Sequence, residues 1–419
     1  MSFKSISVIG LGYIGLPTAA MLASKNKIVI GVDINNDAVK KINKGMIHIV
    51  EPDLESLVYK VVKNGFLKAT LEFQPADAFI ITVPTPFKDV SSNIPEPDLS
   101  YVKTASESIA QVLKKGDLII LESTSPVGTT EQISKWLANI RDDLIFPHMK
   151  GKTPDINIAY CPERVLPGNI IKELINNDRV IGGMTPHCSQ RAIDLYNIFI
   201  KSECFVTNSR TAEMSKLTEN SCRDVQIAFA NELSIICNEL DINVWELIDL
   251  ANRHPRINIL KPGTGVGGHC IAVDPWFIAS KSPEESILIQ TARRRNLDKT
   301  QWVIEDIIIN LNDLALNNNN LLGDNHISFW GLAFKPDIDD LRESPALLVI
   351  EKITSLTSNY SCVEPNISNN DKYNLLSIEE SIQTSNIIVL LVGHKEFYDA
   401  DILSQFNGII LDYCGALKK

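Results

Sequence analysis

Gly10-Leu11-Gly12-Tyr13-Ile14-Gly15 is the stretch of sequence that decides the fold. It follows the apolar run 6–10 and opens an expected helix at 17–24, so its G-x-G-x-x-G pattern predicts the phosphate-binding turn of a βαβ unit. The first glycine permits the tight turn, the second lets backbone approach a pyrophosphate, and the third lets helix pack on strand. The phosphates then lie at a helix N-terminus, which favours negative charge. The candidate cofactor contacts are Gly10, Gly12, Tyr13, Ile14 and Gly15.

A carboxylate at the end of the next expected strand supports this interpretation. Asp33 comes 18 residues after Gly15, where an acidic side chain bonds ribose hydroxyls and repels a 2′-phosphate. We therefore predict NAD rather than NADP as the cofactor. The alternative is a glycine turn in some other α/β fold. Thr85 and Thr124 each follow a later strand at the edge where ligands bind in such sheets, although either residue also suits an ordinary turn.

The first half of the chain alternates apolar runs with helical patterns, which predicts a doubly wound parallel sheet. The expected elements here include strands at 6–10, 28–33, 78–83, 118–122 and 180–182, and helices at 17–24 and 189–199. From about Arg210 the pattern is helical, and the expected helices are 211–240, 244–252 and about 283–314. After Asn317–Asn320, an expected exposed linker, the alternation resumes with strands at 327–331, 387–392 and 409–411 and a helix near 345–356.

These patterns predict the fold class: α/β, with two Rossmann-like doubly wound parallel-sheet domains joined by a central all-helical domain. The expected boundaries are 1–209, 210–316 and 317–419. We expect the first domain to bind NAD, and the long helix of the middle domain to pair with a second copy across a dimer axis.

Composition excludes several classes of protein. The net charge of −11 argues against a nucleic-acid binder, which needs an excess of Lys and Arg. The N-terminal residues lack the apolar run of a signal peptide, and no stretch approaches 18 uninterrupted apolar residues, so we expect no membrane partner. Eight cysteines are scattered without metal-ligand spacing, which predicts no metal and a reducing cytoplasm.

The run Gly263-Thr264-Gly265-Val266-Gly267-Gly268-His269-Cys270 is the second informative stretch. A cysteine that ends a run of glycines suggests backbone folded closely around a ligand, with a thiol presented to it. Asp274 follows four residues later. An inert core position is the alternative for a lone cysteine.

Two further groups of polar residues are candidates for chemistry. Lys216, Asn220 and Arg223 are spaced by four and three residues along the helix expected at 211–240, so they share one face. Taken alone, this stripe predicts a solvated helix face. Positive charge also gathers in Asn-Arg-His-Pro-Arg at 252–256, at Lys261, and at Lys335 and Arg342 after a strand. Such charge suits a diphosphate-bearing substrate, and ordinary surface charge is the alternative.

Taken together, these segments resemble the UDP-glucose/GDP-mannose dehydrogenase family over essentially the whole chain. The matching motifs are G-L-G-Y-I-G at 10–15, S-T-S-P-V-G at 123–128, C-P-E-R at 161–164, K-L-T-E-N at 216–220, G-V-G-G-H-C at 265–270 and G-L-A-F-K-P at 331–336. The resemblance implies NAD on the first domain, a UDP-sugar approaching the last, a helical dimerisation core and a homodimer. The activity it implies is four-electron oxidation of a sugar C6 alcohol to a carboxylate, with two NADH formed and the intermediates bound to Cys270.

The resemblance also implies roles for individual residues. It makes Cys270 the nucleophile, places Lys216, Asn220 and Asp274 around it, and has Glu163 and Thr124 handle water and the reacting oxygens. The implied further contacts to NAD are Thr85, Thr124, Thr130 and Arg342. The implied substrate contacts are Arg164, Val165, Lys216, Asn220, Arg223, His254, Arg256, Gly267, Phe334 and Lys335, with one residue of 254–256 serving the partner subunit's site.

Within the family, the segments 161–168, 252–256 and 267–277 are similar to members that act on UDP-N-acetyl-D-mannosamine. The glucose branch carries a second glutamate four residues after the one that matches Glu163, and this chain has Pro167 there. The glucose branch also has lysine before the aspartate that matches Asp274, and this chain has Val273 there. Both departures favour an N-acetylhexosamine. The resemblance to the family, rather than any single residue, implies a role in making an acidic sugar for a cell-surface polysaccharide.

Three alternatives stay open. The first is a dehydrogenase for UDP-N-acetylglucosamine, with the same chemistry. The second is a single-step hydroxyacid or 6-phosphogluconate-type dehydrogenase, which needs no cysteine and makes one NADH. The third is a non-catalytic NAD-binding regulatory protein, against which the intact Lys216, Asn220, Cys270 and Asp274 argue.

Overall fold

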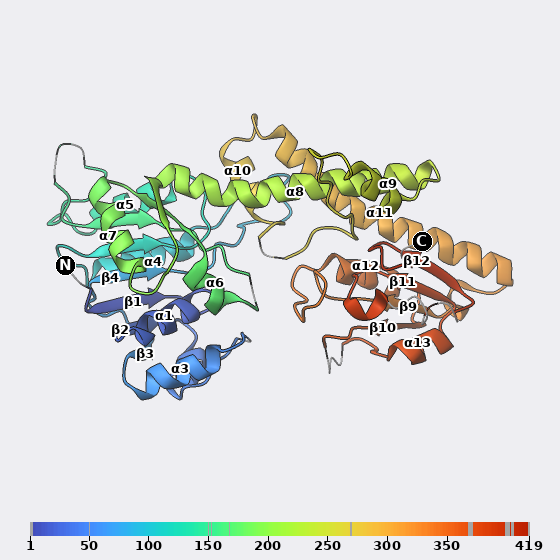
Figure 1. Cartoon of the computed structure of the whole chain (residues 1–419), viewed down its shortest axis with the longest axis horizontal. Helices are drawn as coiled ribbons and strands as arrows, with labels where there is room; N and C mark the ends of the chain where they lie inside the picture. Colours follow the sequence, from blue (N-terminus) through green and yellow to red (C-terminus); the bar gives the residue numbers. More distant parts are fainter. Residues whose placement is uncertain are drawn as a thin grey trace. The chain divides into compact units, whose positions relative to one another are not determined.

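The computed structural model describes residues 3–49, 51–149, 151, 153–166, 168–268, 270–367, 372–398, 403 and 406–417. Pro167 and His269, which were used above, lie outside these residues. The chain packs as two compact units: Met1–Thr218 with Trp276–Pro283, and Glu219–Pro275 with Glu284–Lys419 (Figure 1).

The first unit is built on an eight-stranded sheet with strand order β3-β2-β1-β4-β5-β6-β7-β8. Its strands are β1 (Ser5–Ile9), β2 (Ile28–Val32), β3 (Leu67–Thr70), β4 (Ala78–Ile81), β5 (Leu118–Leu121), β6 (Asn157–Tyr160), β7 (Arg179–Gly183) and β8 (Cys204–Asn208). Its helices are α1 (Gly15–Ser24), α2 (Asn36–Asn43), α3 (Leu54–Lys63), α4 (Ser100–Ala110), α5 (Thr129–Ala138), α6 (Ile170–Asn176) and α7 (Pro186–Tyr196).

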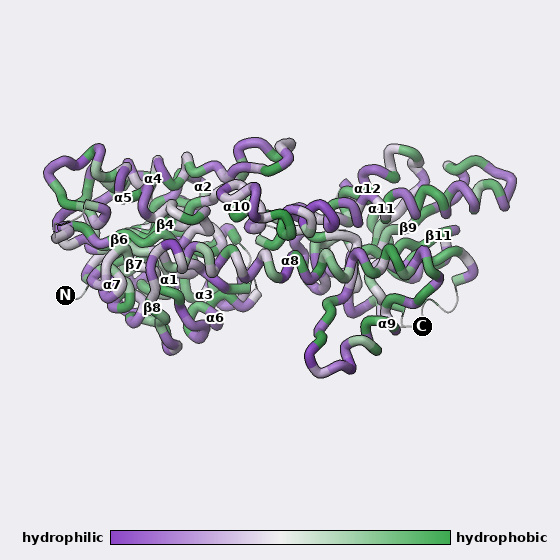
Figure 2. The backbone as a smooth tube through the Cα atoms, turned by 90° about the horizontal axis from the view of Figure 1, so that it is seen from above, coloured by the Kyte–Doolittle hydropathy of each residue, from purple (hydrophilic) through white to green (hydrophobic). Residues whose placement is uncertain are grey.

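The central strands are buried on both faces, as continuous apolar runs predict. Ala78 and Ile80 of β4 join one hydrophobic cluster, whereas Phe79 and Ile81 join another, and all four side chains are fully buried. The period of two therefore divides each strand between two helical layers. Strand β4 is coloured at the hydrophobic end of the scale in Figure 2.

Two neighbouring strands of this sheet, β7 and β8, run opposite to the other six. Strand β7 pairs antiparallel with β6, with Ala159 opposite Gly183 and Tyr160 opposite Gly182, while the remaining pairings are parallel. The expectation of an entirely parallel sheet is therefore wrong at this position. The reversal brings the start of β7 to the carboxyl end of β6, at the edge where the predicted site residues lie.

The rest of the chain is helical and then returns to a sheet. Its elements are α8 (Ser209–Glu239), α9 (Val244–Ala251), α10 (Asp274–Lys281), α11 (Ile287–Asn318), β9 (Ile327–Trp330), α12 (Pro345–Thr354), β10 (Tyr360–Val363), α13 (Ile378–Thr384), β11 (Ile387–Leu390) and β12 (Ile409–Asp412), with short 3-10 turns at Leu322–Asp324 and Lys395–Tyr398. The second sheet is four-stranded and parallel, in the order β10-β9-β11-β12. The α/β fold class with two parallel-sheet regions and a helical middle is confirmed.

The two sheets share one local design. Gly10 and Gly331 both have φ of +89° and follow the first strand of their unit's sheet. The N–H of Leu11 donates to Asp33 Oδ2 at 2.7 Å, and the N–H of Leu332 donates to Glu364 Oε2 at 2.7 Å. In each sheet an acidic residue at the end of the next strand therefore fixes the turn after the glycine.

The three-domain division itself stays a prediction.

One expectation about the elements needs correction. Asn317 and Asn318 are exposed but form the last turn of α11, and Asn319 ends the helix in the left-handed conformation with φ of +51°. The linker therefore begins two residues later than predicted, because asparagine is tolerated near helix C-termini. Helices α8 and α11 have 31 and 32 residues, yet within the described part of the chain no helix has the apolarity of a membrane span.

Candidate active site

The glycine turn after β1 has the geometry that a dinucleotide needs. A Cβ at Gly10 would lie 2.8 Å from the carbonyl oxygen of Thr82, and one at Gly15 would lie 1.8 Å from the carbonyl oxygen of Gly10. Both positions therefore require glycine for packing. A Cβ at Gly12 would meet nothing within 4 Å, so the space above this residue is open to a ligand. Ile14 precedes the first turn of α1, and Tyr13 is half-buried against the core.

Asp33 lies directly after β2 with its carboxylate next to this turn. Its Oδ2 accepts the N–H of Leu11 at 2.7 Å and its Oδ1 accepts the N–H of Asn35 at 2.8 Å. The residue is half-exposed, so the carboxylate keeps acceptor capacity for a ribose hydroxyl. The turn and the acid together fit an adenine dinucleotide without a 2′-phosphate.

Replacing Asp33 by serine should weaken NAD binding and relax the choice between NAD and NADP. The substitution removes charge-assisted acceptors for the ribose and the repulsion of a 2′-phosphate, so we expect the ratio of kcat/KM for NADP over NAD to rise by about 10- to 100-fold. Steady-state kinetics with both cofactors measures it. Asp37→Asn, an exposed carboxylate in the first turn of α2, is the matched control. An unchanged ratio would mean that Asp33 does not contact the ribose.

Three predicted residues lie at the carboxyl edge of the same sheet. Thr85 follows β4 and its hydroxyl donates to the carbonyl oxygen of Thr124 at 2.8 Å, which joins the loops after β4 and β5. Glu163 follows β6, the next strand in the sheet. Thr130 is different: it is fully buried in α5, and its hydroxyl donates to Glu213 at 2.6 Å. The hydroxyl of Thr130 is thus engaged by the protein itself.

Glu163 is held on both of its carboxylate oxygens. Its Oε1 accepts the N–H of Arg164 at 2.6 Å and its Oε2 accepts a bond from Arg179 Nη1 at 2.7 Å, and the residue is 9% exposed. The guanidinium of Arg164 donates to the carbonyl oxygen of Asp178 at 2.6 Å, and Val165 packs against the core. The carboxylate is therefore fixed in place.

The polar stripe on α8 is only partly solvated. Arg223 is exposed and Asn220 is half-buried, but Lys216 is 9% exposed, so the solvated-face interpretation is wrong for the lysine. Lys216 and Asn220 lie one turn apart on the same face of the helix.

Cys270 lies on an exposed turn that leads into α10. Its carbonyl oxygen accepts the N–H groups of Val273 at 3.1 Å and Asp274 at 2.9 Å, so the turn carries the thiol outwards while Asp274 starts the helix. The alternative of an inert core cysteine is wrong. Asp274 is 2% exposed, and its Oδ2 accepts a hydrogen bond from Asn220 Nδ2 at 2.5 Å. This bond ties the cysteine turn to α8.

The glycines before Cys270 allow a close approach to the loop after β9. A Cβ at Gly267 would lie 2.3 Å from the carbonyl oxygen of Glu343 and 3.0 Å from the Cβ of Phe334, and one at Gly268 would lie 2.9 Å from the Phe334 ring. Gly268 also has φ of +81°. Bulkier residues would push the cysteine turn away from Phe334.

Lys335, which follows Phe334 in the chain, is close enough to Cys270 to interact with it electrostatically. Burial lowers the pKa of Lys335, and the nearby charge of Arg223 lowers it further, whereas Asp340 and Cys270 raise it. The charges of Lys335 and Arg223 therefore act on each other, and the thiol of Cys270 acts on Lys335. This arrangement favours an anion, because an anion bound there would relieve the repulsion.

The remaining predicted residues are exposed. Arg342 forms an ion pair with Asp340 at 2.6 Å and its side chain is 47% exposed. His254 and Arg256 lie on the turn after α9, where the N–H of Arg256 donates to His254 Nδ1 at 3.4 Å. Such exposure is what a contact to a ligand or to a second subunit requires.

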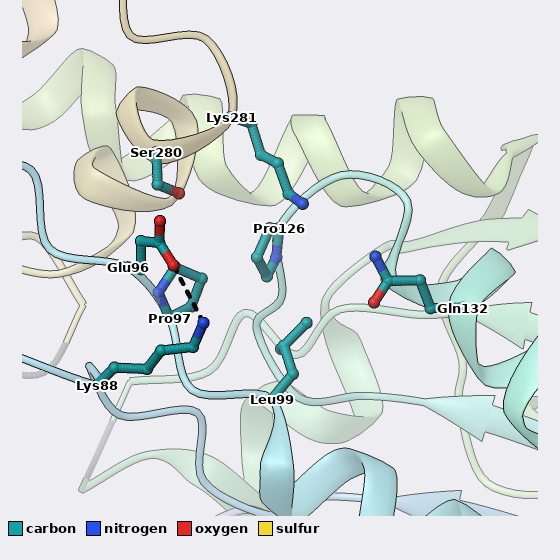
Figure 3. A pocket seen from close by; sticks show the side chains of 8 residues that line it. All are labelled: Lys88, Glu96, Pro97, Leu99, Pro126, Gln132, Ser280 and Lys281. Atoms are coloured by element: carbon teal, nitrogen blue, oxygen red, sulfur yellow. Dashed lines mark hydrogen bonds and ion pairs between the residues drawn. The ribbon is translucent and has the colours of Figure 1, made fainter.

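A pocket of about 340 Å³ lies elsewhere on the first unit (Figure 3). It contains the ion pair between Lys88 and Glu96 at 3.0 Å, whose side chains are 59% and 66% exposed. The other lining residues are Pro97, Leu99, Pro126, Gln132, Ser280 and Lys281. None of the side chains predicted from the sequence lines it, and its charges are those of solvated surface residues.

Sequence reasoning missed Arg179 and Asp340. Arg179 is the first residue of β7 in Asp-Arg-Val-Ile-Gly-Gly, and this charge at the start of an otherwise uncharged strand is the only signal that it leaves in the sequence. Its contact with Glu163 depends on the reversed direction of β7. Asp340 lies five residues after Lys335, and its role as a carboxylate beside Lys335 and Arg342 depends on the fold of that loop.

Comparison with protein families agrees with the motifs. Three family models match successive parts of the chain: the NAD-binding domain of the UDP-glucose/GDP-mannose dehydrogenase family at 4–200, its central domain at 210–297, and its UDP-binding domain at 328–419.

Individual relatives span nearly the whole chain. The UDP-N-acetyl-D-mannosamine dehydrogenase of Escherichia coli is 58% identical over 403 residues, covering 95% of each chain. The NDP-N-acetyl-D-galactosaminuronic acid dehydrogenase of Ralstonia nicotianae is 52% identical, covering 99% of this chain and 96% of the relative. The solved structure of a UDP-D-ManNAc dehydrogenase from Pyrococcus horikoshii superimposes with a TM-score of 0.86 at 38% identity, covering 99% and 96% of the two chains. This chain belongs to the UDP-glucose/GDP-mannose dehydrogenase family.

Proposed function

We propose that this protein oxidises the C6 alcohol of UDP-N-acetyl-D-mannosamine to the carboxylate, with NAD as cofactor and two NADH formed per sugar. One observation carries the proposal: the exposed Cys270 lies on a turn tied through Asp274 to Asn220 at 2.5 Å, with Lys335 close enough to interact with it. A nucleophilic thiol with neighbouring hydrogen-bond donors and cations suits oxidation through a covalent intermediate.

Each of the three proposed domains has a separate role in this reaction. Residues 1–209 hold NAD at the turn 10–15 and Asp33, residues 210–316 form the helical dimerisation and catalytic domain, and residues 317–419 hold the UDP-sugar. Arg342 and the threonines at 85, 124 and 130 serve as further cofactor contacts. For Thr130 the buried hydroxyl favours an indirect role through the loop that it anchors.

The chemistry proceeds in two oxidations. Bound NAD supplies the hydride acceptor for each of them. After the first oxidation, the Cys270 thiolate adds to the C6 aldehyde and forms a thiohemiacetal. The second oxidation converts this adduct into a thioester. Lys216 and Asn220 stabilise the oxyanions that form at the C6 oxygen, because a cation and an amide donor one helical turn apart can both bind it.

Hydrolysis of the thioester ends the cycle. Water adds to the carbonyl carbon, the carbon–sulfur bond breaks, and the products are the sugar carboxylate, the Cys270 thiol and one proton. Glu163, Thr124 and Asp274 handle the water and its protons.

Cations hold the diphosphate of the substrate. The charge of Arg223 lowers the pKa of Lys335, and a phosphate bound near both cations would offset their repulsion. The other substrate contacts are Arg164, Val165, His254, Arg256, Gly267 and Phe334, and one residue of 254–256 reaches the partner subunit's site.

The choice of sugar is tested by kinetics. We expect the kcat/KM for UDP-N-acetyl-D-mannosamine to exceed those for UDP-N-acetylglucosamine and UDP-glucose by at least about 100-fold, the order that specific contacts to one substituent achieve. A second candidate is oxidation of another UDP-N-acetylhexosamine, which the relative from Ralstonia nicotianae favours. A higher kcat/KM for the gluco or galacto sugar would replace the mannosamine assignment with this one.

We further propose that the protein is a cytoplasmic homodimer. All eight cysteines lie among the described residues and none forms a disulfide, as a reducing compartment predicts. Phe229, Ile236 and Leu240 recur at seven and four residues along α8 and its end, and they are 54%, 42% and 60% exposed. An apolar stripe of this kind on a long helix suits pairing with a second copy.

Replacing Phe229 by glutamate should convert the dimer into a monomer. The charge would be buried without a partner at the apolar stripe, so we expect the dimer dissociation constant to rise by at least about 100-fold. Sedimentation velocity from nanomolar to micromolar concentration measures it. Glu232→Gln, on the same helix, is the control. A wild-type protein that stays monomeric at micromolar concentration would contradict the proposal.

A further inference from the structure

The reversed strand β7 places a buried guanidinium beneath the carboxylate of Glu163. Because Ala159 lies opposite Gly183 and Tyr160 opposite Gly182, continuing the register outwards sets residue 179 opposite residue 163. A parallel β7 would have carried Arg179 to the far edge of the sheet. The ion pair of 2.7 Å between Arg179 Nη1 and Glu163 Oε2 confirms the placement.

Arg179 is itself held from several sides. It is 3% exposed, its Nη1 lies 3.7 Å from Glu122 Oε1, and its guanidinium carbon lies 4.9 Å from the centre of the Tyr196 ring. The hydroxyl of Tyr196 donates to Glu122 Oε1 at 2.7 Å. Glu122 and Tyr196 are both fully buried or nearly so, at 3% and 0%. Four side chains, two from the loops after β5 and β6 and one each from β7 and α7, thus form one polar cluster inside an apolar unit.

Within this cluster, Glu163 is the carboxylate that pairs with Arg179. Burial and the negative charge of Glu163 raise the pKa of Glu122 to about 7, while the charge of Arg179 opposes this rise. The Oε2 atom of Glu122 has no hydrogen-bond partner among the described residues, which also favours its neutral form. Of the two carboxylates that face Arg179, Glu163 is the closer, with its Oε2 at 2.7 Å from Nη1 against 3.7 Å for Glu122 Oε1.

A buried ion pair is a costly way to stabilise a protein, because desolvation of both charges offsets most of their attraction. It is well suited to fixing the position of one group. The ion pair with Arg179 and the bond from the N–H of Arg164 restrain both oxygens of Glu163. A restrained carboxylate can order a water molecule in one orientation, whereas a mobile one spends much of its time in others.

We propose that Arg179 is a positioning residue that fixes the Glu163 carboxylate for hydrolysis of the Cys270 thioester, with Glu122 and Tyr196 holding Arg179. This inference rests on the proposed function, since it concerns the last step of that reaction. The step breaks the carbon–sulfur bond, forms a carbon–oxygen bond from water, and needs no redox partner. Arg179 acts only through Glu163, so its loss affects hydrolysis more than either oxidation.

The test compares the pre-steady-state burst with the steady state in the full-length protein. With UDP-N-acetyl-D-mannosamine and excess NAD, Arg179→Met should keep a burst of two NADH per site, with its rate within about threefold of wild type. Its steady-state rate should fall by about 10- to 100-fold, the usual range for loss of one properly placed acid–base group. Mass spectrometry of the quenched protein should show the sugar acyl group on Cys270, released by hydroxylamine.

Two further variants keep the test decisive. Arg179→Lys retains the positive charge but loses the planar guanidinium group. It should therefore fold and give an intermediate steady-state rate with the same burst. The double variant Glu163→Gln/Arg179→Met should hydrolyse the thioester as slowly as Glu163→Gln alone, because a residue that acts through Glu163 adds nothing once that carboxylate is gone. Arg141→Met, which removes an arginine bonded to the carbonyls of Ala110 and Leu113 in the same unit, is the control.

The outcomes separate the inference from the proposed function. A steady-state rate within twofold of wild type in both Arg179 variants would overturn the inference, as would equal losses of burst and steady state. Additive losses in the double variant would also overturn it, because they would show a structural role independent of Glu163. Failure of the wild-type protein to form two NADH per sugar would instead overturn the proposed function.

Discussion

Replacing Cys270 by alanine should abolish formation of the sugar acid, lowering its rate by about 10³-fold or more, as expected when a nucleophile is removed. Without the thiol the aldehyde cannot be captured, so at most one NADH per sugar forms and the thioester never appears. Cys270→Ser should either stop at the same point or leave a slowly hydrolysed ester, because an alkoxide is a poorer leaving group than a thiolate.

Product analysis by mass spectrometry and NADH absorbance measures both variants. Cys222→Ser, which changes another exposed cysteine, is the control and should keep wild-type turnover. Acid produced at the wild-type rate by Cys270→Ala would show that the thiol is not the nucleophile.

Replacing Asp274 by asparagine should lower kcat by about 10²- to 10⁴-fold, the range for removal of a general acid or base. The carboxylate is 2% exposed and accepts from Asn220 Nδ2 at 2.5 Å, so its loss removes a proton acceptor and also loosens the link between the cysteine turn and α8. KM for the UDP-sugar should change less than kcat, because the diphosphate contacts lie elsewhere.

A double-variant cycle with Asn220→Ala measures how far the two residues act together. We expect the double variant to be less impaired than the product of the single effects, since both single variants break the same hydrogen bond. Asp298→Asn, an exposed carboxylate on α11, is the control. Independent, multiplicative effects would show that the bond has no part in catalysis.

Much of this account could be predicted from sequence because it depends on local patterns. The structure places the glycine turn 10–15 directly after β1 and Asp33 directly after β2, as the pattern predicts, and their contacts with NAD stay a prediction. The run of glycines before Cys270 predicted backbone folded closely around a ligand. The structure shows a close approach to a protein side chain, because the Phe334 ring lies 2.9 Å from where a Cβ at Gly268 would be. Steric rules of this kind act within a few residues, so they leave a readable signal.

What could not be predicted depends on contacts between distant segments. Lys216 is buried although its spacing suggested a solvated face, because burial is decided by what packs against the helix. Asn220 and Asp274 are 54 residues apart in sequence, and nothing in either neighbourhood indicates the other. Arg179 reaches Glu163 only because β7 runs antiparallel, and a five-residue apolar strand carries no signal for its direction.

The central claim is a four-electron oxidation through Cys270, and the number of NADH formed per sugar consumed tests it most directly. Purified protein is incubated with excess NAD and a limiting amount of UDP-N-acetyl-D-mannosamine, and NADH absorbance is compared with the sugar acid measured by chromatography. We predict two NADH for each acid formed, with no free aldehyde. One NADH per sugar, with the aldehyde or another two-electron product released, would contradict the account.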